Sequence, residues 1–219
     1  MDKNYFWEKI MNWYNYNKRN FPWRSTDNPY YVLVAEILLQ QTNAGKVEPA
    51  YLEIIKKYPV VNKLAKADLC RLEKIIKPLG LVYRAENLKK CAEIIEEKYS
   101  DYFPNKKDEL KELPGVGDYI SDAVLCYAFD KEVIPIDTNF LRLFTRINNL
   151  KFSCSNKKER EQLLAIIRSF YYFGDCTKEY KFKEYNFAIL DFSGKICKSR
   201  NPKCNKCCLK EKCRYFKPS

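Results

Sequence analysis

The sequence consists largely of segments whose apolar residues recur at the three- and four-residue spacing of amphipathic helices. In residues 5–16, for example, Phe6, Ile10 and Trp13 fall on one side of such a helix. The same spacing predicts helices at residues 30–41, 47–58, 65–76, 84–99, 138–147 and 157–170. No alternating run is long enough for a strand, and proline interrupts the apolar residues 133–136, which we predict to be a connector. The chain is therefore predicted to be all-α, with about ten helices and short turns.

Charge and histidine content restrict the function classes. Lys and Arg number 40 against 28 Asp and Glu, a net charge of +12, which favours nucleic acid as the partner and an anionic membrane only second. The sequence shows no long apolar run and no apolar signal segment, so we expect no membrane association and a cytoplasmic, nucleoid-associated protein. It has no histidine, which excludes Ser-His and Cys-His catalysis and zinc sites with histidine ligands.

Cysteines near the C-terminus form the most specific pattern. Cys197, Cys204, Cys207 and Cys213 follow one another with six, two and five residues between them, in a segment too small to fold by apolar burial alone. Four thiolates suit a [4Fe–4S] cluster or an all-cysteine zinc site. Zinc sites usually show two closely spaced cysteine pairs, and only Cys204 and Cys207 are so spaced here, which favours iron–sulfur. Cys208 is expected to point away from the ligands.

A glycine turn joins two helical patterns in the middle of the chain. Leu113-Pro114-Gly115-Val116-Gly117-Asp118-Tyr119 follows a charged helical segment and precedes an apolar one. Such a helix–hairpin–helix can direct backbone N–H groups at the start of a helix towards a phosphate. An ordinary helix–helix turn would look the same, so the turn alone does not decide between the two.

The hairpin, the Asp137 that follows Tyr119 by 18 residues, and the cysteine tail together resemble the helix–hairpin–helix DNA glycosylase superfamily, in its endonuclease III and MutY branch. The resemblance implies two helical domains around a DNA-binding cleft. One would be a six-helix barrel domain at residues 29–133. The other would combine residues 1–28 and 134–219 and carry the cluster loop. It also implies a monomer that binds double-stranded DNA with a mismatched or damaged base, which is flipped out of the duplex.

Three residues match catalytic positions of that superfamily. Asp137 matches its aspartate, which stabilises the cationic sugar or activates water, and the residue also suits a helix N-cap. Tyr119 stands where bifunctional members carry a Schiff-base lysine, which implies base release without strand cleavage. Glu36 lies among apolar residues and matches a glutamate that protonates the departing base in MutY enzymes. Burial would raise its pKa and keep that proton available.

The resemblance also assigns residues to DNA contact. Leu113, Gly115, Val116 and Gly117 form the hairpin that would bind the strand. Gln40, Gln41 and Thr42 resemble the segment that enters the base stack beside the flipped nucleotide. Tyr83 and Arg84 match a loop that faces the opposite strand.

The superfamily alone leaves the excised base open. MutY enzymes remove adenine opposite 8-oxoguanine, usually carry a further C-terminal domain, and usually have Gly-Asn after the catalytic aspartate. Here Thr138-Asn139 follows Asp137, and Gly117-Asp118-Tyr119 resembles the thymine–guanine mismatch glycosylases. We therefore expect removal of thymine or uracil opposite guanine. An adenine glycosylase, supported by Glu36, and a non-enzymatic DNA-binding module, supported by charge, are the alternatives.

Overall fold

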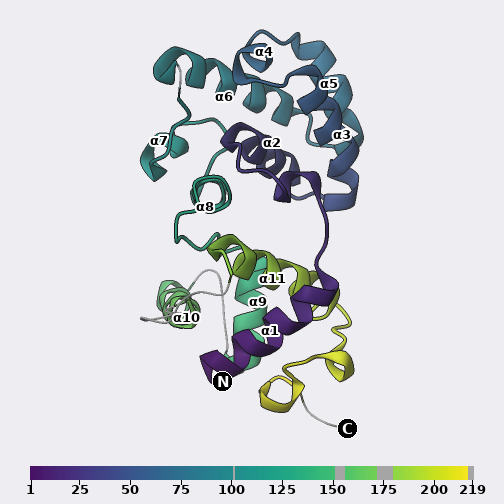
Figure 1. The fold of residues 1–219 in the computed structure, drawn as a ribbon, viewed down its shortest axis with the longest axis vertical. Coiled ribbons are helices and arrows are strands. Elements are labelled where there is room, and N and C mark those ends of the chain that lie inside the picture. Colours follow the sequence, from purple (N-terminus) through teal and green to yellow (C-terminus); the bar gives the residue numbers. More distant parts are fainter. Residues whose placement is uncertain (101, 151–155, 172–179, 217–219) are drawn as a thin grey trace. The chain divides into compact units, whose positions relative to one another are not determined.

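A computed structural model describes residues 1–100, 102–150, 156–171 and 180–216. These residues form eleven α-helices and four short 3₁₀ segments, and they contain no strand, which confirms the predicted all-α class (Figure 1). No helix among them is long and apolar enough to cross a bilayer. The chain divides into two compact units. Unit 1 combines residues 1–19 and 136–219, and unit 2 is the continuous segment 20–135.

Unit 2 is built around α2, whose residues are buried along almost its whole length. Asn28 caps α2 with its side chain, and Pro29 occupies its first turn, where no N–H is needed. Helices α3, α6 and α8 pack against α2. The elements are η1 (Pro22–Arg24), α2 (Pro29–Leu39), α3 (Ala44–Lys57), α4 (Val61–Ala65), α5 (Leu69–Ile76), η2 (Lys77–Leu79), α6 (Tyr83–Tyr99), α7 (Lys107–Lys111) and α8 (Asp118–Tyr127).

Unit 1 brings the N-terminal helix against the C-terminal third of the chain. Phe6 lies 5.4 Å from Phe144 and 5.0 Å from Phe170 between ring centres, and the Trp7 indole N–H donates to the Phe170 carbonyl at 2.7 Å. These buried aromatic contacts join segments that are far apart in sequence. The elements are α1 (Lys3–Asn17), α9 (Thr138–Asn148), α10 (Lys157–Phe170), α11 (Phe182–Lys195), η3 (Cys204–Lys206) and η4 (Lys210–Lys212).

Two predictions about helices need correction. The single helix predicted at residues 65–76 is two helices, because Asp68 accepts the Arg71 N–H and starts α5 after a break. The second miss is α11, which apolar spacing did not predict. Its buried residues include Phe182, Tyr185, Asn186, Ile189 and Asp191, and a helix buried on nearly all sides shows no amphipathic period.

Candidate active site

The hairpin of unit 2 connects α7 to α8 through a turn that requires one of its two glycines. Gly115 has φ +79°, and a Cβ there would come 2.7 Å from the Asn87 side-chain nitrogen. A Cβ on Gly117 would meet no atom within 4 Å, so the fold itself does not require glycine at that position. Leu113 and Val116 are buried at 2% and 6% exposure, which leaves mainly the backbone of the turn for contact with a ligand.

The first turn of α8 is open to an external acceptor. Its N-cap is Gly117, which offers no side chain to the first N–H groups, whereas α2, α5 and α9 are capped by Asn28, Asp68 and Asp137. The N–H groups of a first helical turn have no acceptor within the helix. The predicted phosphate-binding geometry is therefore available in this hairpin.

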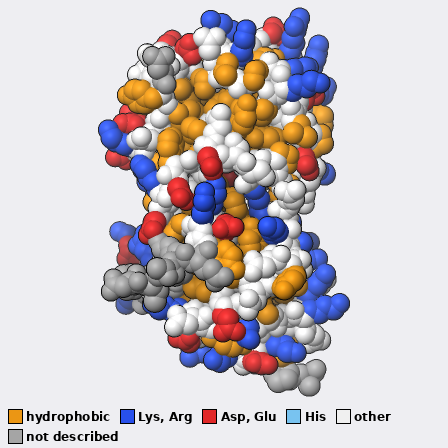
Figure 2. All heavy atoms as spheres, in the orientation of Figure 1, with side chains coloured by type: hydrophobic (Ala, Val, Ile, Leu, Met, Phe, Trp, Pro, Cys, Tyr) orange, Lys and Arg blue, Asp and Glu red, His pale blue; other side chains and the backbone are white. Residues whose placement is uncertain are grey.

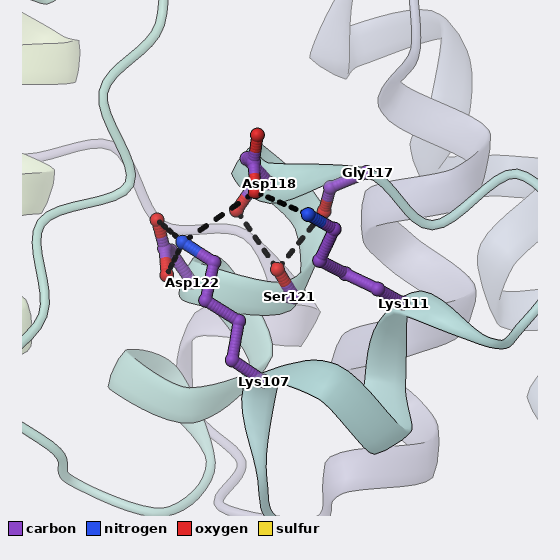
Figure 3. A network of polar contacts seen from close by, with 6 residues as sticks. All are labelled: Lys107, Lys111, Gly117, Asp118, Ser121 and Asp122. Atoms are coloured by element: carbon purple, nitrogen blue, oxygen red, sulfur yellow. Dashed lines mark hydrogen bonds and ion pairs between the residues drawn. The ribbon is translucent and has the colours of Figure 1, made fainter.

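Ion pairs brace the same hairpin from the side (Figure 3). Lys111 and Lys107 lie 2.9 Å and 3.7 Å from an Asp118 oxygen, and Lys107 also reaches Asp122 at 2.8 Å. The hydrogen bond from Lys111 lowers the pKa of Asp118. Ser121 Oγ lies 3.0 Å from the carbonyl oxygens of both Gly117 and Asp118. Together these contacts tie α7 to the start of α8.

The segment after α2 is attached both to the hairpin and to α6. Gln40 Nε2 donates to the Gly115 carbonyl at 3.0 Å. Arg84 donates to the carbonyls of Leu38 at 2.6 Å and Gln40 at 2.5 Å, and to Thr42 Oγ1 at 2.8 Å. Residues 38–42, the turn at Gly115 and the start of α6 therefore form one connected part of unit 2.

Arg84 itself requires a correction. Its side chain is 0% exposed, so the prediction that it contacts DNA is wrong for this structure; it supports the 38–42 segment from inside. Tyr83, its neighbour, is 50% exposed. Gln41 is exposed and has φ +53° in the turn after α2.

Glu36 belongs to a buried polar cluster in unit 2. Its residue is 5% exposed on α2, which packs against α8. Tyr127 on α8 is 4% exposed, and burial raises its pKa far above the usual value, with further contributions from Tyr119 and Glu36. Glu36, Tyr119 and Tyr127 therefore lie close together. Sequence analysis missed Tyr127, although it follows Tyr119 by two helical turns and shares its helix face.

Asp137 is the N-cap of α9, which is one of the two roles considered for it. Its Oδ1 accepts the N–H groups of Asn139 at 2.8 Å and Phe140 at 3.0 Å, and its Oδ2 accepts the Asn139 side-chain amide. Burial raises the pKa of Asp137, while the hydrogen bonds from Phe140 and Asn139 and the charge of Arg142 act in the opposite direction. The carboxylate is thus fixed in position and partly withdrawn from water.

A chain of hydrogen bonds leads from this carboxylate to the cysteine tail. Asn139 Oδ1 accepts from Arg142 Nη2 at 2.8 Å, and Arg142 Nε donates to the Cys197 carbonyl at 2.8 Å. One turn further on, Arg146 Nη1 lies 3.4 Å from Cys197 Sγ. The prediction from sequence missed Asn139, Arg142 and Arg146. Their three- and four-residue spacing after Asp137 was the available signal.

The four predicted ligand cysteines line one pocket of unit 1. Cys197, Cys204, Cys207 and Cys213 share this pocket with apolar side chains of α9 and α11, and Cys208 is not among its lining residues. Burial raises the pKa of the Cys197 thiol and that of the Cys207 thiol to about 12. Among the described residues, no three His, Cys, Asp or Glu side chains are placed to hold a single metal ion.

A family model described as "HhH-GPD superfamily base excision DNA repair protein" matches residues 34–169 of the sequence. The chain belongs to this family. It is 34% identical to a thymine/uracil-DNA glycosylase of Methanothermobacter thermautotrophicus, over 96% of this chain and 93% of that protein. An adenine DNA glycosylase of Buchnera aphidicola subsp. Baizongia pistaciae is 32% identical over 96% of this chain and 58% of that protein.

Solved structures of HhH-GPD relatives agree with this assignment. A thermostable thymine-DNA glycosylase superposes with a TM-score of 0.84 at 33% identity, over 97% of this chain and 95% of that one. An endonuclease III bound to DNA superposes with a TM-score of 0.78 at 24% identity over 98% of this chain, which shows a shared fold. The HhH-GPD protein described here is therefore a DNA N-glycosylase of base excision repair, and the two enzymatic hypotheses displace that of a non-enzymatic module.

Proposed function

We propose that this glycosylase removes thymine or uracil opposite guanine and leaves an abasic site. Two archaeal relatives named thymine/uracil-DNA glycosylase are 34% and 35% identical to it over at least 95% of its length. The carrying observation on this chain is the capped carboxylate of Asp137, together with a tyrosine rather than a lysine at residue 119. Without an amine at residue 119, no imine with the sugar can form there.

In this mechanism the chain's residues act on the charge that develops as the base leaves. Cleavage of the base–sugar bond creates an oxocarbenium-like sugar. The carboxylate of Asp137, held by two backbone N–H groups, would stabilise that cation or accept a proton from attacking water. The hairpin backbone at Gly115 and Gly117 would bind the DNA strand. Gln40, Gln41, Thr42 and Tyr83 would contact bases near the target.

A second candidate is excision of adenine. It is favoured by the buried position of Glu36 against Tyr127, which suits a carboxyl that holds a proton for a departing purine. The adenine glycosylase of Buchnera cited above is 32% identical to this chain. The two candidates differ in the base they release, and the same catalytic carboxylate would serve either reaction.

End-labelled duplexes containing T·G, U·G and A·8-oxoguanine test the proposal directly. We expect release from T·G and U·G, seen as strand breaks only after hot alkali, because the enzyme leaves an intact abasic strand. Borohydride should trap no covalent complex. Cleavage of the adenine strand alone would select the second candidate, and breaks without alkali would contradict the proposed absence of lyase activity.

We further propose that Cys197, Cys204, Cys207 and Cys213 hold a [4Fe–4S] cluster. Their sulfur atoms line one pocket, and the neighbouring Arg146 guanidinium lies 3.4 Å from one of them, where it would offset thiolate charge. When bound, the cluster would hold the tail through four iron–thiolate bonds. The tail also carries the carbonyl of Cys197, to which Arg142 donates.

Cys207→Ser should abolish the brown colour and the iron content of anaerobically purified protein. Wild type should contain about four irons and four acid-labile sulfides per chain. The control is Cys208→Ser, because Cys208 adjoins the pocket in sequence but does not line it; this variant should keep its iron. Stoichiometric zinc in wild-type protein, or iron retained in Cys207→Ser, would contradict the assignment.

A further inference from the structure

A second positively charged groove lies in unit 2, between α3 and α5. It is lined by Glu53, Lys57, Tyr58, Arg71, Lys74 and Ile75. Lys57 lies 2.7 Å from Glu53, which neutralises that pair. Arg71 and Lys74 are exposed, and among the described residues no carboxylate lies within ion-pair distance of either side chain. The groove therefore has two cations available for an external anion.

Neighbouring residues extend the positive charge beyond the groove. Lys56 near the end of α3 and Lys77 after α5 are both exposed, and again no carboxylate among the described residues pairs with either. The Asp68 carboxylate is occupied as the cap of α5. Figure 2 shows Lys and Arg side chains gathered over the end of unit 2 where α3, α4 and α5 lie in Figure 1.

The chain links this groove to the segments assigned to base contact. Helix α3 begins directly after residues 40–42, and α5 runs through η2 into residues 80–83. Leu81, Val82 and Tyr83 are 38%, 37% and 50% exposed there, and Arg84 ties this turn to Gln40 and Thr42. At 1.5 Å per residue, Lys57 lies about 20 Å along α3 from Ala44. The groove is thus outside the space that one extruded nucleotide occupies.

We propose that the α3–α5 groove binds the phosphate backbone of a duplex arm, about six base pairs from the target nucleotide. The separation of about 20 Å corresponds to that number of base pairs, because each strand places one phosphate per 3.4 Å of duplex axis. Arg71 and Lys74 would each neutralise one phosphate. The inference rests on the proposed function only in requiring duplex DNA as the ligand. An acidic protein is disfavoured because the groove offers few apolar anchors, its Ile75 being 7% exposed.

The test compares the double variant Arg71→Gln/Lys74→Gln with wild type on a 30-base-pair duplex carrying a central tetrahydrofuran abasic site. Loss of two phosphate contacts should lower the slope of log Kd against log salt by about 2, and weaken binding on the order of tenfold at 0.2 M salt. Shortening the duplex to about four base pairs on one side of the lesion should abolish the difference, since the phosphates that reach the groove are then absent.

Lys90→Gln/Lys98→Gln is the matched control, because it removes the same net charge on α6 from residues already paired with Glu86 and Glu112. It should leave the salt slope near that of wild type. If the groove variant behaves like this control on the long duplex, the proposal is overturned and an acidic protein partner becomes the alternative. Unchanged single-turnover base release from a short T·G duplex would show that the fold and the proposed activity persist. Absence of release by wild type would count against the proposed substrate, not against the groove.

Discussion

Asp137→Asn should reduce single-turnover base release at least about a thousandfold while leaving DNA binding and folding intact. Asparagine caps helices as well as aspartate does, so α9 keeps a side-chain oxygen for the N–H groups of Asn139 and Phe140. What disappears is the negative charge that the sugar cation requires. The measurement is the single-turnover rate on the duplex that wild type cleaves, with enzyme above the Kd of each variant.

Asp68→Asn provides the control for this substitution. Asp68 caps α5 as Asp137 caps α9, and it too accepts a backbone N–H, that of Arg71. The same change of charge and the same retained cap should leave its rate within about twofold of wild type, because a surface charge so placed adds little. A similar loss of rate in both variants would show that capping, and not the carboxylate charge of Asp137, governs activity.

The pH profile of wild type should carry the signature of the same group. Because burial raises the pKa of Asp137, its carboxylate forms only above the range of an ordinary aspartate, whose pKa is 3.8. Base release should therefore rise with pH through that raised pKa. Stability changes in the opposite sense: the folded protein binds the proton more tightly than the unfolded chain, so Asp137 lowers the free energy of unfolding as pH rises through the same window. Asp137→Asn should remove both effects.

Arg84→Met should cost about 3–5 kcal/mol of unfolding free energy, the second large effect. The guanidinium is 0% exposed and donates to the carbonyls of Leu38 and Gln40 and to Thr42 Oγ1. Methionine fills similar space but leaves those buried oxygens without their donor. For a chain of this size the loss corresponds to a fall in Tm of roughly 10 °C. Chemical denaturation followed by circular dichroism gives the free energy directly.

Two comparisons define how Arg84 acts. Arg84→Lys should recover only part of the loss, because an ammonium group cannot reproduce the planar fork that reaches two carbonyls. Arg71→Met makes the same substitution at an exposed arginine of α5, and its stability should stay within about 0.5 kcal/mol of wild type. Equal stability of Arg84→Met and wild type would contradict the structural role given to Arg84.

Much of the architecture was accessible from sequence, for a local reason. Amphipathic helices announce themselves through apolar spacing, and residues 157–170 were predicted with the bounds that α10 has in the structure. Where burial on all sides erases that spacing, as in α11, prediction failed. The cysteine spacing likewise identified four side chains that line one pocket, because a short tail limits how far its own residues can separate.

The sequence by itself determined the helical class, the hairpin, the cysteine set and Asp137, since each depends on residues close together in the chain. Tertiary structure alone decided that Arg84 lies inside, that Tyr127 borders Glu36, and that Asn139 and Arg142 connect Asp137 to the carbonyl of Cys197. A side chain's burial and its distant hydrogen-bond partners depend on which helices pack together. That choice is made by the summed packing of the whole unit, and no local pattern encodes it.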